Sequence, residues 1–269
     1  MHRGVAAVIV LLAVLASIAG LAIGSFLNVV IHRVPRGESV VAPRSRCPHC
    51  QTPIAPRHNV PVLSWLLLRG KCAHCRGPIS VRYPLVELAT AALFAGVTLR
   101  FGATPALPAY LYLAAISVAL ALIDLDVKRL PDAIVKPSYL VGIVLLVPAV
   151  LAGGDWRGGL RALAAMGVLW AFYLVLWLIY PAGMGWGDIK LAGVLGLYLG
   201  WLGWGSLLVG AFAAFLLGGV MSTVLLVARR AGRKSMIPFG PFMLAGALVA
   251  VFAAAPLSHW YVALLTPTV

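Results

Sequence analysis

The sequence predicts an all-α polytopic membrane protein of about eight transmembrane helices with a small zinc-ribbon-like cytoplasmic domain. Of its 269 residues, 62% are hydrophobic and 10% are charged, whereas soluble domains carry roughly 25% charged residues. Uncharged stretches run from Gly4 to Ile31 and from Leu191 to Ala228, and a membrane span needs about 20 apolar residues. Two Cys-x-x-Cys pairs lie in the single extended polar region. This composition excludes a water-soluble enzyme, a secreted disulfide scaffold and a disordered tail.

Eight apolar segments are candidate spans. They lie near residues 5–31, 84–100, 106–123, 134–152, 160–180, 189–203, 205–228 and 238–263. We read the first as a retained span, because its apolar run continues well past the length of a signal-peptide core. The sixth is the shortest, and its glycines, among them Gly193, Gly196 and Gly200, are expected to let neighbouring helices approach closely.

The chain is expected to divide into three regions. Residues 1–34 hold the first span, residues 35–83 form a zinc-binding loop domain, and residues 84–269 form a transmembrane core that contains the two aspartates described below. The loop domain is small enough to need a metal or another cross-link to hold its fold.

The basic residues predict the orientation. With eight spans, 17 of the 21 Lys and Arg residues fall on one side, in residues 33–82, 124–136, 190 and 229–234. The positive-inside rule puts that side, with the loop domain, in the cytoplasm. The net charge of +14 is thereby explained by topology, so we expect membrane lipids and no nucleic acid as partners. A reducing cytoplasm also disfavours disulfides.

The cysteines predict a structural metal site. Cys47 and Cys50 are separated by 21 residues from Cys72 and Cys75, close to the spacing of zinc ribbons. Four thiolates close a tetrahedral shell, so the zinc would be structural. The alternative is four free thiols. His49 and His74 lie between the cysteines and are taken as bystanders.

Two aspartates stand at the ends of apolar segments. Asp124 follows the run 114–123, and Asp188 directly precedes the sixth span. Because two spans separate them, both reach the cytoplasmic face and can meet there. Of two adjacent carboxylates, one keeps a proton while the other acts as a base toward water. The alternative is a pair of solvated loop carboxylates bound to nearby lysines or arginines.

The remaining polar residues have simpler interpretations. We expect Asp126 to be a solvated charge, Asp132 to cap the fourth span and Asp155 to be a loop residue. Glu87, one turn into the second span, needs either a basic partner or a cationic substrate group. Asn28 is expected to join two helices by a hydrogen bond.

Several motifs, in this order, resemble those of the type IV prepilin peptidases, which are bifunctional leader peptidases and N-methyltransferases. They are Gly24–Pro35, the two Cys-x-x-Cys pairs, Asn59–Trp65, Ile79–Leu88, Ile123–Asp126, Leu130–Asp132 and the GxGD-type segment Gly185–Lys190.

The resemblance implies an aspartic protease of the bacterial inner membrane with Asp124 and Asp188 as its catalytic pair. Asp124 is preferred to Asp126 because it stands seven residues before Pro131, the D-x6-P spacing of simpler relatives. Its substrates would be prepilins or pseudopilins of type IV pili or type II secretion. They carry a short basic leader that ends in Gly before an apolar helix beginning with Phe.

The resemblance also implies methylation of the new N-terminus with S-adenosylmethionine, served by the loop domain and nearby spans. No glycine-rich nucleotide-binding motif marks the methyl-donor site. Candidate substrate or methyl-transfer residues are Glu87, Gly185, Gly187 and Lys190.

Three other functions remain open at this point. A carboxylate-based ion or proton transporter is disfavoured because no inverted repeat with paired broken helices is evident. A peptidase without methyltransferase activity is disfavoured because minimal relatives lack the zinc loop. The third is a non-catalytic zinc scaffold for a secretion machine.

Overall fold

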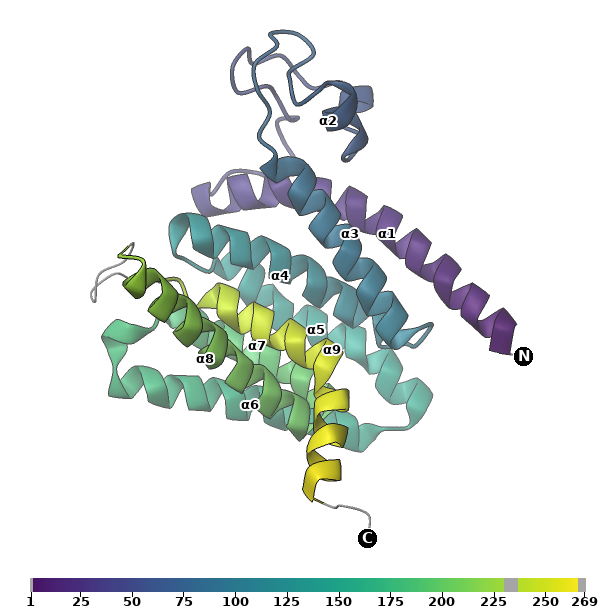
Figure 1. Cartoon of the computed structure of the whole chain (residues 1–269), viewed down its shortest axis with the longest axis vertical. Helices are drawn as coiled ribbons and strands as arrows, with labels where there is room; N and C mark the ends of the chain where they lie inside the picture. The colour runs from purple at the N-terminus through teal and green to yellow at the C-terminus, as the bar shows by residue number, and fades with distance from the viewer. Residues whose placement is uncertain (1, 230–236, 266–269) are drawn as a thin grey trace. The chain divides into compact units, whose positions relative to one another are not determined.

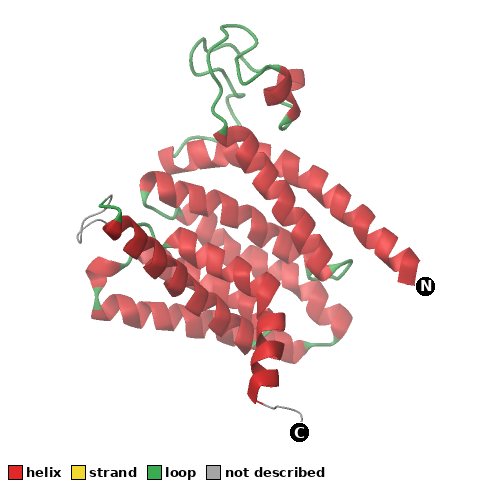
Figure 2. Cartoon of the chain, viewed as in Figure 1, coloured by secondary structure: helices red, strands yellow, loops and turns green. Residues whose placement is uncertain are grey.

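The computed structural model describes residues 2–229 and 237–265, and these residues form α-helices, short 3-10 helices and loops, with no strand (Figure 2). The α-helices are α1 (His2–Arg33), α2 (Leu63–Leu67), α3 (Arg82–Phe101), α4 (Leu107–Val127), α5 (Asp132–Gly153), α6 (Trp156–Ile179), α7 (Trp186–Leu202), α8 (Trp204–Val227) and α9 (Gly240–Leu265). The 3-10 helices are η1 (Val34–Arg36), η2 (Pro56–His58) and η3 (Pro181–Gly183).

The long helices confirm the predicted fold class. Each of the eight predicted spans coincides with one helix other than α2. Within the described residues, six of these helices are long and apolar enough to cross a membrane, namely α1, α3, α4, α5, α6 and α8. Helix α7 has 17 residues, which agrees with the short sixth span. Most of the basic segment 229–234 used in the topology argument lies outside the described residues.

The chain forms two compact units, and the first comprises residues 1–119. In this unit α1 and α3 pack against each other (Figure 1). A Cβ atom added at Gly20 would lie 2.7 Å from Cα of Ala91, and one added at Gly24 would lie 2.7 Å from Cα of Glu87. Asn28 Nδ2 donates to the carbonyl of Tyr83 over 3.2 Å. The interhelical role predicted for Asn28 is therefore confirmed.

The second unit, residues 120–269, is built around α7. This helix packs against α5, α6, α8 and α9 (Figure 1), and nearly all of its side chains are buried. A Cβ atom added at Gly196 would lie 2.5 Å from the carbonyl oxygen of Ala165, and one at Gly200 would lie 3.1 Å from Cα of Ala162. The prediction that glycines of the sixth span permit close helix packing is confirmed.

Asp155 lies in the loop before α6, as predicted, whereas the cap predicted for Asp132 is wrong. Asp155 is the N-cap of α6, and its Oδ1 accepts a hydrogen bond of 2.8 Å from the N–H of Gly158. Asp132 is not a cap, because Pro131 occupies the N-cap position of α5 and Asp132 is the first helical residue. Its carboxylate binds two lysine side chains instead.

Candidate active site and metal centre

The four cysteines form one cluster in the first unit. Their sulfur atoms all lie within 4.8 Å of one another. Each pair sits in a similar turn: the N–H of Cys47 donates to Thr52 and the N–H of Cys72 donates to Gly77, over 3.0 and 2.8 Å. These two turns direct four thiols toward one point, and neither His49 nor His74 belongs to the cluster.

The thiol chemistry of this cluster suits a soft cation. Hydrogen bonds from Thr52 lower the pKa of the Cys50 thiol to about 6. At Cys75 a backbone hydrogen bond from Gly77 lowers the pKa, but desolvation and the neighbouring thiols outweigh it and raise the pKa to about 11. Four thiolates this close repel one another unless a cation lies among them. The cluster could therefore hold a metal ion such as zinc in a tetrahedral shell.

Asp124 lies in the last turn of α4 and is buried, whereas Asp126 is exposed. The Oδ2 atom of Asp124 accepts a hydrogen bond of 3.1 Å from the N–H of Gly240, the first residue of α9. A Cβ atom added at Gly240 would lie 2.7 Å from that oxygen. Glycine at position 240 is thus what lets the backbone approach the carboxylate.

Asp188 lies in the first turn of α7 and is buried to the same degree, with 6% of its surface exposed against 5% for Asp124. Its Oδ2 accepts a hydrogen bond of 3.0 Å from the N–H of Gly185, the N-cap residue. The carboxylate therefore sits at the positive end of the helix dipole, which favours negative charge.

The second unit brings these two aspartates together. Their carboxylates interact electrostatically, and the side chain of Leu130 contacts the backbone beside both of them. A Cβ atom added at Gly187 would lie 3.0 Å from Cβ of Leu130, and one added at Gly240 would lie 3.3 Å from Cδ2 of the same residue. The arrangement is a pair of neighbouring buried carboxylates, each bound to a backbone N–H.

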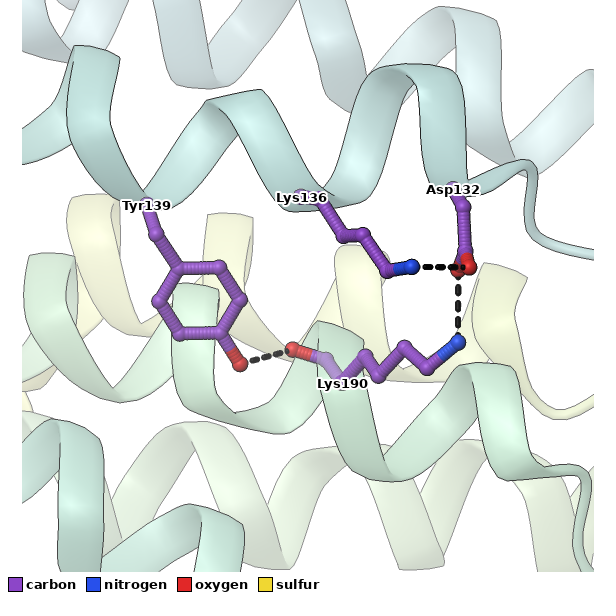
Figure 3. Close-up of polar contacts among 4 residues, drawn as sticks. All are labelled: Asp132, Lys136, Tyr139 and Lys190. Carbon is purple, nitrogen blue, oxygen red and sulfur yellow. Dashed lines mark hydrogen bonds and ion pairs between the residues drawn. The ribbon is translucent and has the colours of Figure 1, made fainter.

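Lys190, a predicted substrate or methyl-transfer residue, has a partner within the chain (Figure 3). Its Nζ lies 2.6 Å from Oδ1 of Asp132, whose Oδ2 lies 2.7 Å from Nζ of Lys136. The hydroxyl of Tyr139 donates to the carbonyl of Lys190 over 2.5 Å. Helix α5 thereby binds the first turn of α7, the turn that carries Asp188.

Glu87 belongs to the first compact unit, whereas Asp124 and Asp188 belong to the second. Its buried Oε2 accepts a hydrogen bond of 2.7 Å from the N–H of Val62. Val62 has φ +58° and ψ −51°, a positive-φ conformation that costs a β-branched residue of order 1–3 kcal/mol. The Glu87 contact thus offsets strain where the loop domain meets α3. Sequence reasoning missed this partner, because nothing local to Glu87 or Val62 indicates it.

Two family models match the chain. The bacterial peptidase A24 N-terminal domain matches residues 18–101, which include the cysteine cluster and Glu87. The type IV leader peptidase family matches residues 111–223, which include Asp124 and Asp188. The chain belongs to the type IV leader peptidase family. The two compact units of this chain correspond broadly to the two matched segments.

The curated relatives in this family are similar over most of their length. The prepilin leader peptidase/N-methyltransferase of Aeromonas hydrophila is 38% identical, with 90% of each chain covered. That of Stutzerimonas stutzeri is 36% identical, covering 88% of this chain and 89% of the relative. That of Myxococcus xanthus is 44% identical over 84% of this chain and 67% of the relative. A comparison with solved structures found no significant match.

We expect the purified chain to carry about one metal ion, because the four thiols fit one tetrahedral shell. Cys47→Ser should lose the metal and destabilise residues 35–83, since metal binding supplies folding free energy to so small a domain. Elemental analysis of protein purified without chelator measures this. His49→Ala and His74→Ala are matched controls that should keep the metal. Absence of stoichiometric metal from the unaltered chain would contradict the prediction.

Proposed function

We propose that this leader-peptidase family member cleaves prepilins or pseudopilins through Asp124 and Asp188 at the cytoplasmic face of the inner membrane. It then methylates the new N-terminus with S-adenosylmethionine. Its relatives bear the name prepilin leader peptidase/N-methyltransferase, and its apolar helices and family make it an integral inner-membrane protein. The observation that carries the proposal is the pair of buried carboxylates on α4 and α7.

The pair supplies an acid and a base for peptide hydrolysis. Two neighbouring carboxylates do not both ionise readily, so one keeps a proton. The ionised carboxylate takes a proton from water as that water attacks the scissile carbonyl carbon. The protonated carboxyl group donates to the carbonyl oxygen. Collapse of the resulting tetrahedral intermediate breaks the C–N bond. The leaving nitrogen receives a proton from the carboxyl group that took one, and the other carboxylate takes back a proton from a hydroxyl of the intermediate.

The position of the pair suits such substrates. Asp124 lies in the last turn of α4 and Asp188 in the first turn of α7, so both lie near the ends of apolar helices. A basic leader would stay in the cytoplasm while its apolar helix enters the bilayer, and the scissile bond would then lie at the interface between them. Gly185 is exposed and leaves the backbone beside Asp188 open to a substrate chain, whereas Gly187 faces the side chain of Leu130.

The methyltransferase activity is assigned to the first unit. S-adenosylmethionine, when bound, supplies an electrophilic methyl group to the neutral N-terminal amine. The metal in our proposal is a structural zinc held by Cys47, Cys50, Cys72 and Cys75, which fixes the loop domain. Glu87 lies at the junction of that domain with α3, where a carboxylate can orient the new ammonium group or accept its proton.

The aspartate pair is tested with purified protein, a prepilin and S-adenosylmethionine, with products read by mass spectrometry. Asp124→Asn and Asp188→Asn should each lower cleavage by at least about 100-fold, because an amide supplies neither acid nor base. Asp126→Asn is the matched control on the same helix and should stay active. An inactive Asp126→Asn beside an active Asp124→Asn would refute the assignment. Cleavage without the mass of an added methyl group would show a peptidase that lacks methyltransferase activity.

The contact of Lys190 with Asp132 is expected to position Asp188. Asp132→Asn and Lys190→Met should each reduce cleavage about fivefold, the effect of losing roughly 1 kcal/mol of helix positioning, and the double variant should be no worse. Lys136 also binds the Asp132 carboxylate, but it lies on α5 and not on α7. Lys136→Met should therefore have little effect on cleavage. Equal losses at Lys136 and Lys190, measured as initial rates, would contradict a positioning role.

Glu87→Gln should impair methylation more than cleavage. A glutamine oxygen can still accept from the Val62 N–H, so the fold is kept, but the amide cannot accept a proton from the ammonium group. Glu87→Ala removes the hydrogen bond as well and serves as the comparison. Both activities are measured on each variant. Normal methylation by Glu87→Gln with a loss in Glu87→Ala would make Glu87 a structural anchor only.

A further inference from the structure

Helix α2 lies beside the membrane-spanning part of α3. Its N-cap residue Val62 donates to Glu87 Oε2 over 2.7 Å. Glu87 is the sixth residue of α3, so it lies roughly 7.5 Å along a helix that is long and apolar enough to span the bilayer. The five residues of α2 rise at most about 7.5 Å. Every residue of α2 therefore lies within or next to the interfacial layer of the membrane.

At this depth α2 presents a row of leucines to its surroundings. Leu63, Leu66 and Leu67, spaced i, i+3 and i+4, are 51%, 59% and 73% exposed. The opposite side of α2 is bound to the loop domain. Ser64 Oγ donates to the carbonyl of Arg57, and Trp65 Nε1 donates to the carbonyl of Ile79. These contacts fix the rotation of α2, so the three leucines, here called the leucine edge, point away from the domain.

Apolar side chains of α3 near the start of α2 are exposed as well. Leu85 and Leu88 flank Glu87 and are exposed, as expected for a helix face that contacts acyl chains. Because Glu87 binds the N-cap residue of α2, the leucine edge begins close to these two side chains. The lipid-facing surface of α3 thus continues onto the loop domain.

The charge around the leucine edge identifies the kind of lipid. Residues 39–86 contain seven Lys and Arg residues and no Asp or Glu. Three of these cations, Arg57, Arg69 and Lys71, flank α2 in sequence and are exposed. Apolar side chains combined with flanking cations are the pattern of segments that lie in an anionic membrane interface.

We propose that the leucine edge inserts into the bilayer leaflet next to the loop domain, with Arg57, Arg69 and Lys71 on anionic phospholipid headgroups. The zinc-ribbon-like domain is then held against the membrane at two points, through Glu87 on α3 and through α2. This fixes the orientation of the domain above the lipid surface and is independent of the proposed chemistry.

The test uses the full chain in vesicles of phosphatidylcholine and phosphatidylglycerol containing a phospholipid with a diazirine near the start of its acyl chain. After irradiation, trypsin cleavage after Arg57 and Arg69 releases residues 58–69 with the leucine edge. Cleavage after Arg36 and Arg44 releases residues 37–44, the control peptide, because Val41 is apolar and 86% exposed. We expect residues 58–69 to carry severalfold more label than residues 37–44, and less label in vesicles of phosphatidylcholine alone.

The double variant Leu66→Ser/Leu67→Ser should lose the label from residues 58–69 while keeping it on residues 83–100 of α3. Retained metal content shows that its loop domain is folded. Label on residues 58–69 no higher than on 37–44 overturns the proposal, and equal label in neutral vesicles overturns the role of the headgroups. If a photocrosslinking residue at position 67 captures prepilin while lipid label is absent, the leucine edge binds substrate instead.

Discussion

The second unit depends on keeping two carboxylates buried next to each other in an apolar helical bundle. Charge at such depth is expensive, and few side chains can offset it. Asp124 and Asp188 are each satisfied by the N–H of a glycine, Gly240 and Gly185, at the start of a helix. Because a Cβ atom at Gly240 would lie 2.7 Å from an oxygen of the Asp124 carboxylate, a larger residue there would displace either the carboxylate or the start of α9. The entry of α9 and the first turn of α7 are therefore both set by the aspartates.

Helix α7, which carries Asp188, is held in place by contacts at both of its ends. At its carboxyl end, Arg161 donates from Nε to the carbonyl of Gly200 and from Nη2 to that of Trp201, over 2.8 and 2.7 Å. At its amino end, Lys190 binds α5. Between these ends, the glycines bring the α7 backbone against α6. A helix bound at both ends and tightly packed between them cannot rotate easily, so the direction of Asp188 is well defined.

The sequence was sufficient for features with a local signal. Long uncharged runs predicted the helices and the cysteine spacing predicted the thiol cluster. The resemblance to the family, through its D-x6-P spacing, pointed to Asp124, which the structure buries while Asp126 stays exposed. The sequence was insufficient where a partner lies far along the chain. Gly240 is 116 residues from Asp124, and the N–H of Val62 has no side-chain pattern that links it to Glu87. Asp132 was predicted to be a local cap because its partner Lys190 lies 58 residues away in the sequence, where no local pattern indicates it.

Burial limits the partners that an acidic side chain can find. The buried carboxylates Glu87, Asp124 and Asp188 all accept from backbone N–H groups, whereas the partly exposed Asp132 binds lysines. Lysine and arginine keep their charged ends in water, so they serve carboxylates at the surface. Deeper carboxylates need donors that the backbone already supplies, which are the unpaired N–H groups at helix starts and in loops. In this chain each buried acid therefore also fixes a backbone segment: the loop domain at Val62, the start of α9 at Gly240, and the first turn of α7 at Gly185. The groups that carry charge for chemistry thereby also position the segments around them.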